Sequence, residues 1–152
     1  MKFDKIHNKG QAQIFKNQYL EYLTKTHPLV IWGMYIPIVA YMLYYSRSSV
    51  GLGTGTVLGI FFFGIFFWSF FEYIMHRWVF HFVSQNPKVM RVVYVMHGNH
   101  HEYPRDKERL FMPPVPSLII SSVLFSVFYF FGYLFGVSGM AFSFFPGFIL
   151  GY

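Results

Sequence analysis

Five of the seven histidines in this chain fall within 26 residues, and the chain contains no cysteine. Imidazole nitrogens bind iron, zinc and copper alike, and without thiolates a transition-metal site must use nitrogen and oxygen ligands. A single histidine near a membrane surface would mean little, but a cluster argues for a shared role. The sequence therefore predicts a metal site with the candidate ligands His76, His81, His97, His100 and His101.

The spacing of these histidines limits how they could share an ion. On a helix, His97, His100 and His101 differ by about −60° and +40° in azimuth, so all three should project from one face. His76 and His81 are separated by about 140° on an ideal helix. We therefore expect either that they serve different ions or that the helix breaks or rewinds between them.

Polar residues beside the histidines are candidates to orient their rings. Glu72 lies one helical turn before His76, and a carboxylate near a membrane boundary is costly unless it is paired or functional. Such a carboxylate is suited to accept the second N–H of a ligating imidazole. Asn99, Glu102 and Asp106 are candidates for the same role beside the later histidines, and solvated polar residues at the headgroup level are the alternative.

The segments that carry these residues are too apolar for a domain that faces water. Charged residues make up 12% of the 152-residue chain, whereas a typical soluble domain has about 25%. The apolar stretches predict an all-α, polytopic membrane bundle of about four transmembrane helices with a cytoplasmic, histidine-bearing cap. The expected spans are 29–45, 57–75, 117–135 and a fourth from about Met140 onward.

The basic residues predict the orientation of these spans. Eleven of the twelve lie before the first span or between the second and third, so the positive-inside rule places this side, with the amino terminus and the histidines, in the cytoplasm. This pattern indicates membrane orientation rather than nucleic-acid binding.

The pattern of apolar and charged stretches divides the chain into two parts. Residues 1–28 are expected to form a cytoplasmic segment, either an interfacial amphipathic helix over 14–23 or a frayed tail. Residues 29–152 are expected to form the membrane domain, within which 76–116 bind metal.

Two motifs resemble those of the fatty acid hydroxylase and sterol desaturase superfamily of membrane-bound non-haem di-iron enzymes. Residues 72–81, EYIMHRWVFH, are similar to the EYxxHRxxxH box of that family. Residues 97–116 are similar to the HGxHHxxPxDxxRLxxPPxP run of its fatty acid 2-hydroxylase branch. Sterol desaturases and carotenoid hydroxylases share the histidine boxes but match the region after them less well.

The resemblance implies O2-dependent hydroxylation of a lipid acyl chain, most specifically fatty acid 2-hydroxylation. Two iron ions would carry the C–H chemistry, with electrons from a separate electron-transfer protein, although zinc suits the same ligands. Arg105 is a candidate contact for a carboxylate or phosphate head group, whereas Arg77 and Arg109 are interpreted as topological charge.

The resemblance also concerns the end of the chain. Family members continue from a Gly-Tyr pair into further histidines, and this chain ends at Gly151-Tyr152. We therefore expect the carboxy-terminal part of the domain to be missing, with about half of the family's ligands. This chain alone is then not expected to build the complete two-metal site.

Other functions remain open. The first is a sterol desaturase-like or carotenoid hydroxylase-like oxidoreductase of the same superfamily. The second is a bis-histidine haem protein that transfers electrons, which needs histidines that face each other across helices. The third is a metal-binding or transport protein without redox chemistry, but the first three spans contain no acidic residue or histidine within the membrane apart from Glu72 at a boundary.

Overall fold

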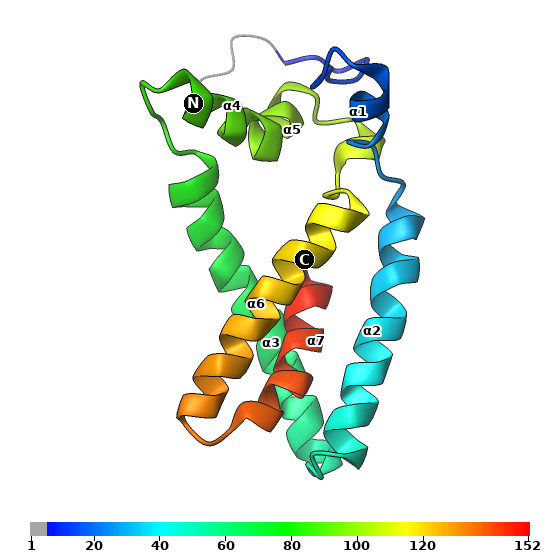
Figure 1. Cartoon of the computed structure of the whole chain (residues 1–152), viewed down its shortest axis with the longest axis vertical. Helices are drawn as coiled ribbons and strands as arrows, with labels where there is room; N and C mark the ends of the chain where they lie inside the picture. The colour runs from blue at the N-terminus through cyan, green and yellow to red at the C-terminus, as the bar shows by residue number, and fades with distance from the viewer. Residues whose placement is uncertain (1–5) are drawn as a thin grey trace. The chain divides into compact units, whose positions relative to one another are not determined.

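The computed structural model describes residues 6–152 and, within them, an all-helical chain without strands. The chain divides into two compact units (Figure 1). The first comprises the chain up to Ile31 together with Glu72–Pro113, and the second comprises Trp32–Phe71 and Pro114–Tyr152. The α-helices are α1 (Gln18–Tyr22), α2 (Pro28–Ser48), α3 (Thr54–Ile74), α4 (Pro87–Val93), α5 (Asn99–Glu102), α6 (Pro114–Leu134) and α7 (Ala141–Gly151).

Three helical segments are long and apolar enough to cross a membrane, so the prediction of a membrane helical bundle is confirmed. They are Pro28–Ser48, Thr54–Phe80 and Lys107–Leu134, with mean hydropathies of 1.5, 1.9 and 1.9. The expected fourth span is a shorter apolar helix here, because α7 has 11 residues whereas a span needs about 20.

Close backbone contact between α3 and α7 organises the second unit. A Cβ atom on Gly64 would meet the carbonyl oxygen of Phe144 and lie 2.9 Å from the backbone nitrogen of Phe148. Aromatic rings pack around this contact: Phe67 lies 5.5 Å from Phe144 and 6.3 Å from Phe148, between ring centroids. Small residues that let two helices approach are a common basis of helix packing in membranes.

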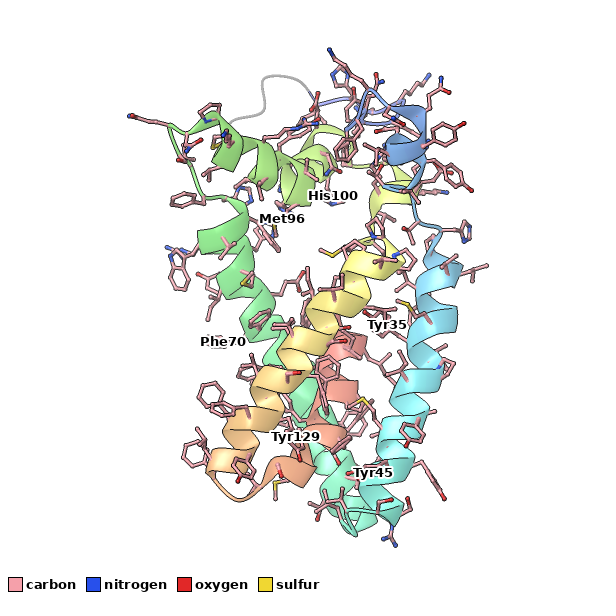
Figure 2. The ribbon with its side chains drawn as sticks, viewed as in Figure 1. Tyr35, Tyr45, Phe70, Met96, His100 and Tyr129 are labelled. Carbon is pink, nitrogen blue, oxygen red and sulfur yellow. The ribbon has the colours of Figure 1, made fainter. Side chains whose placement is uncertain are left out.

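Buried hydroxyl groups join the remaining helices of this unit. The Tyr35 hydroxyl on α2, labelled in Figure 2, lies 2.7 Å from the Ser117 hydroxyl and 3.1 Å from that of Ser121 on α6. Ser46 on α2 and Ser143 on α7 are fully buried and share a further hydrogen bond. These pairs satisfy polar groups that would be costly to leave unpaired in lipid.

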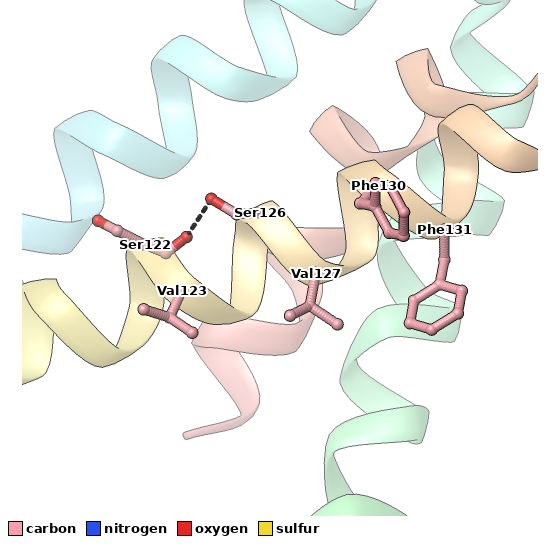
Figure 3. A pocket seen from close by; sticks show the side chains of 6 residues that line it. All are labelled: Ser122, Val123, Ser126, Val127, Phe130 and Phe131. Atoms are coloured by element: carbon pink, nitrogen blue, oxygen red, sulfur yellow. Dashed lines mark hydrogen bonds between the residues drawn. The ribbon is translucent and has the colours of Figure 1, made fainter.

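The outer face of α6 carries a shallow apolar hollow (Figure 3). The Ser126 hydroxyl donates a hydrogen bond to the carbonyl oxygen of Ser122 at 2.8 Å, so this polar group is satisfied by its own helix. The hollow is lined by Ser122, Val123, Ser126, Val127, Phe130 and Phe131.

The amino-terminal segment is less helical than its apolar spacing predicts. Helix α1 has five residues, and its Asn17 side chain caps the first turn. Ile14 and Phe15 precede the helix, and their backbone N–H groups donate to the Glu21 carboxylate at 3.0 and 2.7 Å. The prediction of a helix over 14–23 is therefore wrong in extent, because a side chain rather than a helical carbonyl satisfies these donors.

The α3–α7 contact gives a test of the fold. Gly64→Ala should lower the free energy of unfolding by about 1–3 kcal/mol, because the added methyl group overpacks the contact. Gly59→Ala on the same helix is the matched control, since nothing lies within 4 Å of its Cβ position. Unfolding in mixed detergent micelles, followed by circular dichroism, compares the two. Equal stability of the variants would show that the helices do not meet at Gly64.

Candidate metal centre

Four of the five predicted ligands form one cluster in the first unit. His76, His81, His97 and His101 each offer a ring nitrogen, and these four nitrogens all lie within 4.8 Å of one another. All four side chains are partly buried. Residues 76–81 and 97–101 thus contribute two imidazoles each.

The first pair lies on a π-helical turn. The turn η1 (Met75–Phe80) directly follows α3, and the backbone N–H of His81 donates to the carbonyl of His76 at 3.2 Å, an i→i+5 hydrogen bond. This widened turn places His81 above His76, and their Nε2 atoms lie 3.0 Å apart. Of the two alternatives that the spacing left open, the structure therefore has the rewound helix.

The second pair lies where a similar turn, η2 (Tyr94–Gly98), which carries His97, leads directly into the α-helix α5, which carries His101. The Nε2 atoms of His97 and His101 lie 2.7 Å apart. Residues four apart lie on one face of a helix, so both rings point the same way.

His100 does not join the cluster. Its ring centroid lies 6.2 Å from that of His97 and 6.2 Å from that of His101. The predicted convergence of three imidazoles therefore becomes a convergence of two, His97 and His101. Figure 2 labels His100, and Met96, on this helical segment.

The predicted ring-orienting residues make other contacts. Glu72 is exposed, and the structure gives it no hydrogen bond or ion pair with a described residue. Asn99 is buried, and its amide donates to backbone carbonyls rather than facing a ring. Glu102 accepts a 2.7 Å hydrogen bond from the Tyr94 hydroxyl. Its Oε1 atom lies 3.8 Å from the Nε2 atom of His7. A role for these residues in orienting imidazoles stays a prediction.

Asp106 belongs to a buried ion cluster that the sequence analysis missed. The Arg109 guanidinium donates to the Asp106 carboxylate at 2.8 Å and also to the Glu21 carboxylate. The Arg109 and Asp106 side chains are each 3% exposed. Interpreting Arg109 as topological charge does not explain this burial, whereas the i,i+3 spacing of opposite charges could have indicated the pair. Arg105, the candidate head-group contact, is exposed.

Burial favours the neutral form of three of these imidazoles. Burial, together with repulsion from the neighbouring rings, lowers the pKa of His97 from 6.5 to about 4. The pKa values of His81 and His101 are lowered for the same reasons. Neutral imidazole is the form that binds metal.

The donor set fits a transition-metal ion. Imidazole nitrogens bind zinc at about 2.0–2.1 Å, so two of them on one ion are at most about 4.2 Å apart. The four nitrogens here need only a small adjustment from their spread of up to 4.8 Å. Four imidazoles without a carboxylate or thiolate suit iron, zinc and copper, so the ligands alone do not identify the metal.

Comparisons with known proteins find lipid hydroxylases that are similar to this chain. It is 33% identical to a dihydroceramide fatty acyl 2-hydroxylase of Arabidopsis thaliana over 116 residues, which cover 76% of this chain and 48% of the relative. It is 34% identical to a ceramide very long chain fatty acid hydroxylase of Schizosaccharomyces pombe, over 74% of this chain and 33% of the relative. No family model matches.

A solved structure supports the same relationship. The visible hydroxylase domain of full-length scs7p superposes with a TM-score of 0.78 at 30% identity, over 94% of this chain and 53% of that chain. The chain belongs to the fatty acid hydroxylase superfamily. Membership confirms the resemblance seen in the two histidine motifs. The chain spans about a third to a half of the length of the curated superfamily members compared here.

The lowered histidine pKa values predict how the metal-free protein responds to pH. Between pH 6.5 and about 4 the unfolded chain binds protons that folded His97 does not, so stability falls as the pH decreases through this window. The melting temperature with chelator present should be lower at pH 5 than at pH 7. His97→Gln, which cannot take the proton, should show a smaller difference, and an unchanged difference would contradict the lowered pKa.

The buried ion cluster makes a separate prediction. Arg109→Met leaves Asp106 buried without its partner and should cost about 3–5 kcal/mol of stability. Arg105→Met removes an exposed positive charge four residues earlier and serves as the matched control. Denaturant unfolding measures both variants. A similar, small effect of the two substitutions would show that Arg109 contributes no more than a surface charge.

Proposed function

We propose that this chain provides a metal-binding membrane core of an O2-dependent lipid acyl hydroxylase that acts at carbon 2 of a long acyl chain. The observation that carries the proposal is the set of four imidazole nitrogens within 4.8 Å. The similarity of this chain to fatty acid and ceramide hydroxylases also supports the proposal.

The ring packing favours a metal ion over haem. Ring centroids in the cluster lie 4.5 Å apart for His76 and His97 and 4.9 Å for His81 and His101, two pairs that join the different segments. A bis-histidine haem needs room for a planar macrocycle between two opposed imidazoles. Four rings in mutual contact leave little such room, whereas they can surround a single ion.

The protein's own residues bind and orient the ion in this proposal. Four histidines would hold iron. His76 and His81 lie at the end of the apolar segment Thr54–Phe80, and His97 and His101 lie on η2 and α5. Phe80 stacks on the His97 ring at 5.0 Å and limits its rotation. When bound, iron supplies the oxidation of an unactivated C–H bond, which no side chain can perform. A second iron ion remains an expectation from the resemblance.

The position of the histidines at the end of an apolar segment supports the proposed substrate. His76 lies near the end of the candidate span Thr54–Phe80, and His81 directly follows it. An acyl tail in the bilayer would bring its carbon 2 close to the headgroup level, where Arg105 could bind a carboxylate or phosphate. A cytoplasmic orientation of the histidines, O2 as co-substrate and a separate electron-transfer protein belong to the proposal.

Metal titration tests the proposed site directly. The purified chain in lipid nanodiscs, stripped of metal and titrated with Fe²⁺ under anaerobic conditions, should bind about one ion per chain. His97→Ala should weaken binding about 100-fold or more, because it removes one of four ligands. His27→Ala, outside the cluster, should bind like the wild type, and His100→Ala should retain one ion. Absence of bound metal in the wild type, or a Soret band, would overturn the proposed site.

Lipid analysis tests the proposed reaction. The chain would be expressed in a host without 2-hydroxy acyl lipids, and its lipids would be analysed by mass spectrometry beside the His97→Ala variant. Accumulation of 2-hydroxy acyl chains only with the wild type supports the reaction. Oxidised sterols or carotenoids in their place would assign the chain to another branch of the superfamily.

A further inference from the structure

A buried asparagine lies at the centre of the HGNHH segment but faces its backbone. Asn99 is 6% exposed and sits between the ligands His97 and His101. Its side-chain Nδ2 lies 2.7 Å from the carbonyl oxygen of Val95 and 3.3 Å from that of Tyr94. The carbonyl of Tyr94 also accepts the backbone N–H of Asn99, which closes the i→i+5 bond of the π turn. One residue thus contacts the widened turn through both its backbone and its side chain.

The widened turn needs this support because it departs from the regular helical pattern. Shifting hydrogen bonds from i→i+4 to i→i+5 disturbs the pairing of carbonyl groups at the point where the two patterns meet. A buried carbonyl without a donor costs about 1–3 kcal/mol. The Asn99 amide supplies a donor to the Val95 carbonyl, four residues earlier, and so stabilises the turn in its wide form.

A second hydrogen bond also stabilises the segment from Tyr94 to Glu102. The Tyr94 hydroxyl donates to the Glu102 carboxylate at 2.7 Å, which joins the two ends of the segment that carries His97 and His101. Burial and this bond raise the pKa of Tyr94 to about 12, so the hydroxyl keeps its proton and remains a donor at neutral pH. Because the segment ends are held independently, loss of the Asn99 amide should disturb the turn locally rather than unfold it.

We propose that Asn99 is a positioning residue for the metal ligands: its amide holds the wide η2 turn that carries His97 against α5, which carries His101, and so sets the direction in which the two nitrogens point toward one ion. This inference rests on the proposed metal site and deepens it. It differs from the role expected from the sequence, in which Asn99 would accept a hydrogen bond from an imidazole. The ligands are oriented here through the backbone that carries them.

A matched pair of substitutions tests the proposal. Asn99→Ala removes the amide donors, whereas Asn99→Ser retains a short hydroxyl that can donate to the carbonyl four residues earlier. Both would be compared with the wild type in nanodiscs, with Co²⁺ as the probe. Competition with a chelator measures affinity, the visible absorption of bound Co²⁺ reports ligand geometry, and circular dichroism with thermal melting reports the fold.

The expected result is a split between the two variants. Asn99→Ala should bind Co²⁺ about 10–100-fold more weakly with an altered visible spectrum, at unchanged helicity, and Asn99→Ser should recover most of both. Wild-type affinity and spectrum in Asn99→Ala would overturn the positioning role and leave the metal site standing. Equal weakening of both variants with loss of helicity would assign Asn99 to folding alone. Failure of the wild type to bind Co²⁺ would overturn the metal site itself.

Discussion

The structure depends on bringing four imidazoles into mutual contact. Their ring nitrogens lie within hydrogen-bonding distance in two pairs, His76 with His81 and His97 with His101. Each neutral ring can donate one hydrogen and accept one, so each pair can satisfy only part of its capacity internally. Burial of the His97 ring, together with the like charges that protonation would place side by side, lowers its pKa. A cation coordinated by all four nitrogens resolves both problems, and the backbone is shaped to present them.

The need to hold these backbone turns in place explains why polar contacts hold the first unit together. Its helices α4 and α5 are short, at 7 and 4 residues, and neither can bury much apolar surface. The chain is tied instead by the Arg109 cluster with Asp106 and Glu21, and by the bond from the Arg91 guanidinium to the Ile14 carbonyl. A buried ion cluster is directional, whereas apolar packing is not. It suits a region whose task is to fix the orientation of two turns.

The sequence predicted the helical class, three apolar spans and the residues that form the cluster. It could not predict the turn geometry, because azimuths calculated for an ideal α-helix place His76 and His81 about 140° apart. Nothing in their residue types reveals an i→i+5 turn, and the same uncertainty made His100 look equivalent to His101. The charge count likewise treated Arg109 as one of twelve cations. Its burial arises from Glu21, a residue 88 positions away, and only the fold brings that pair together.

The widened turn η1 solves a geometric problem for the first histidine pair. The metal-facing histidines are five residues apart in the first pair and four apart in the second, and the nitrogens of each pair must point toward the same ion. A regular α-helix rotates residue i+4 by about 40° and residue i+5 by about 140° from residue i. The i,i+4 pair therefore shares a face of an ordinary α-helix, whereas the i,i+5 pair comes together only because a π turn advances by a smaller angle per residue. The η1 turn is therefore not incidental to the cluster, because the i,i+5 pair of a regular α-helix could not meet at one ion.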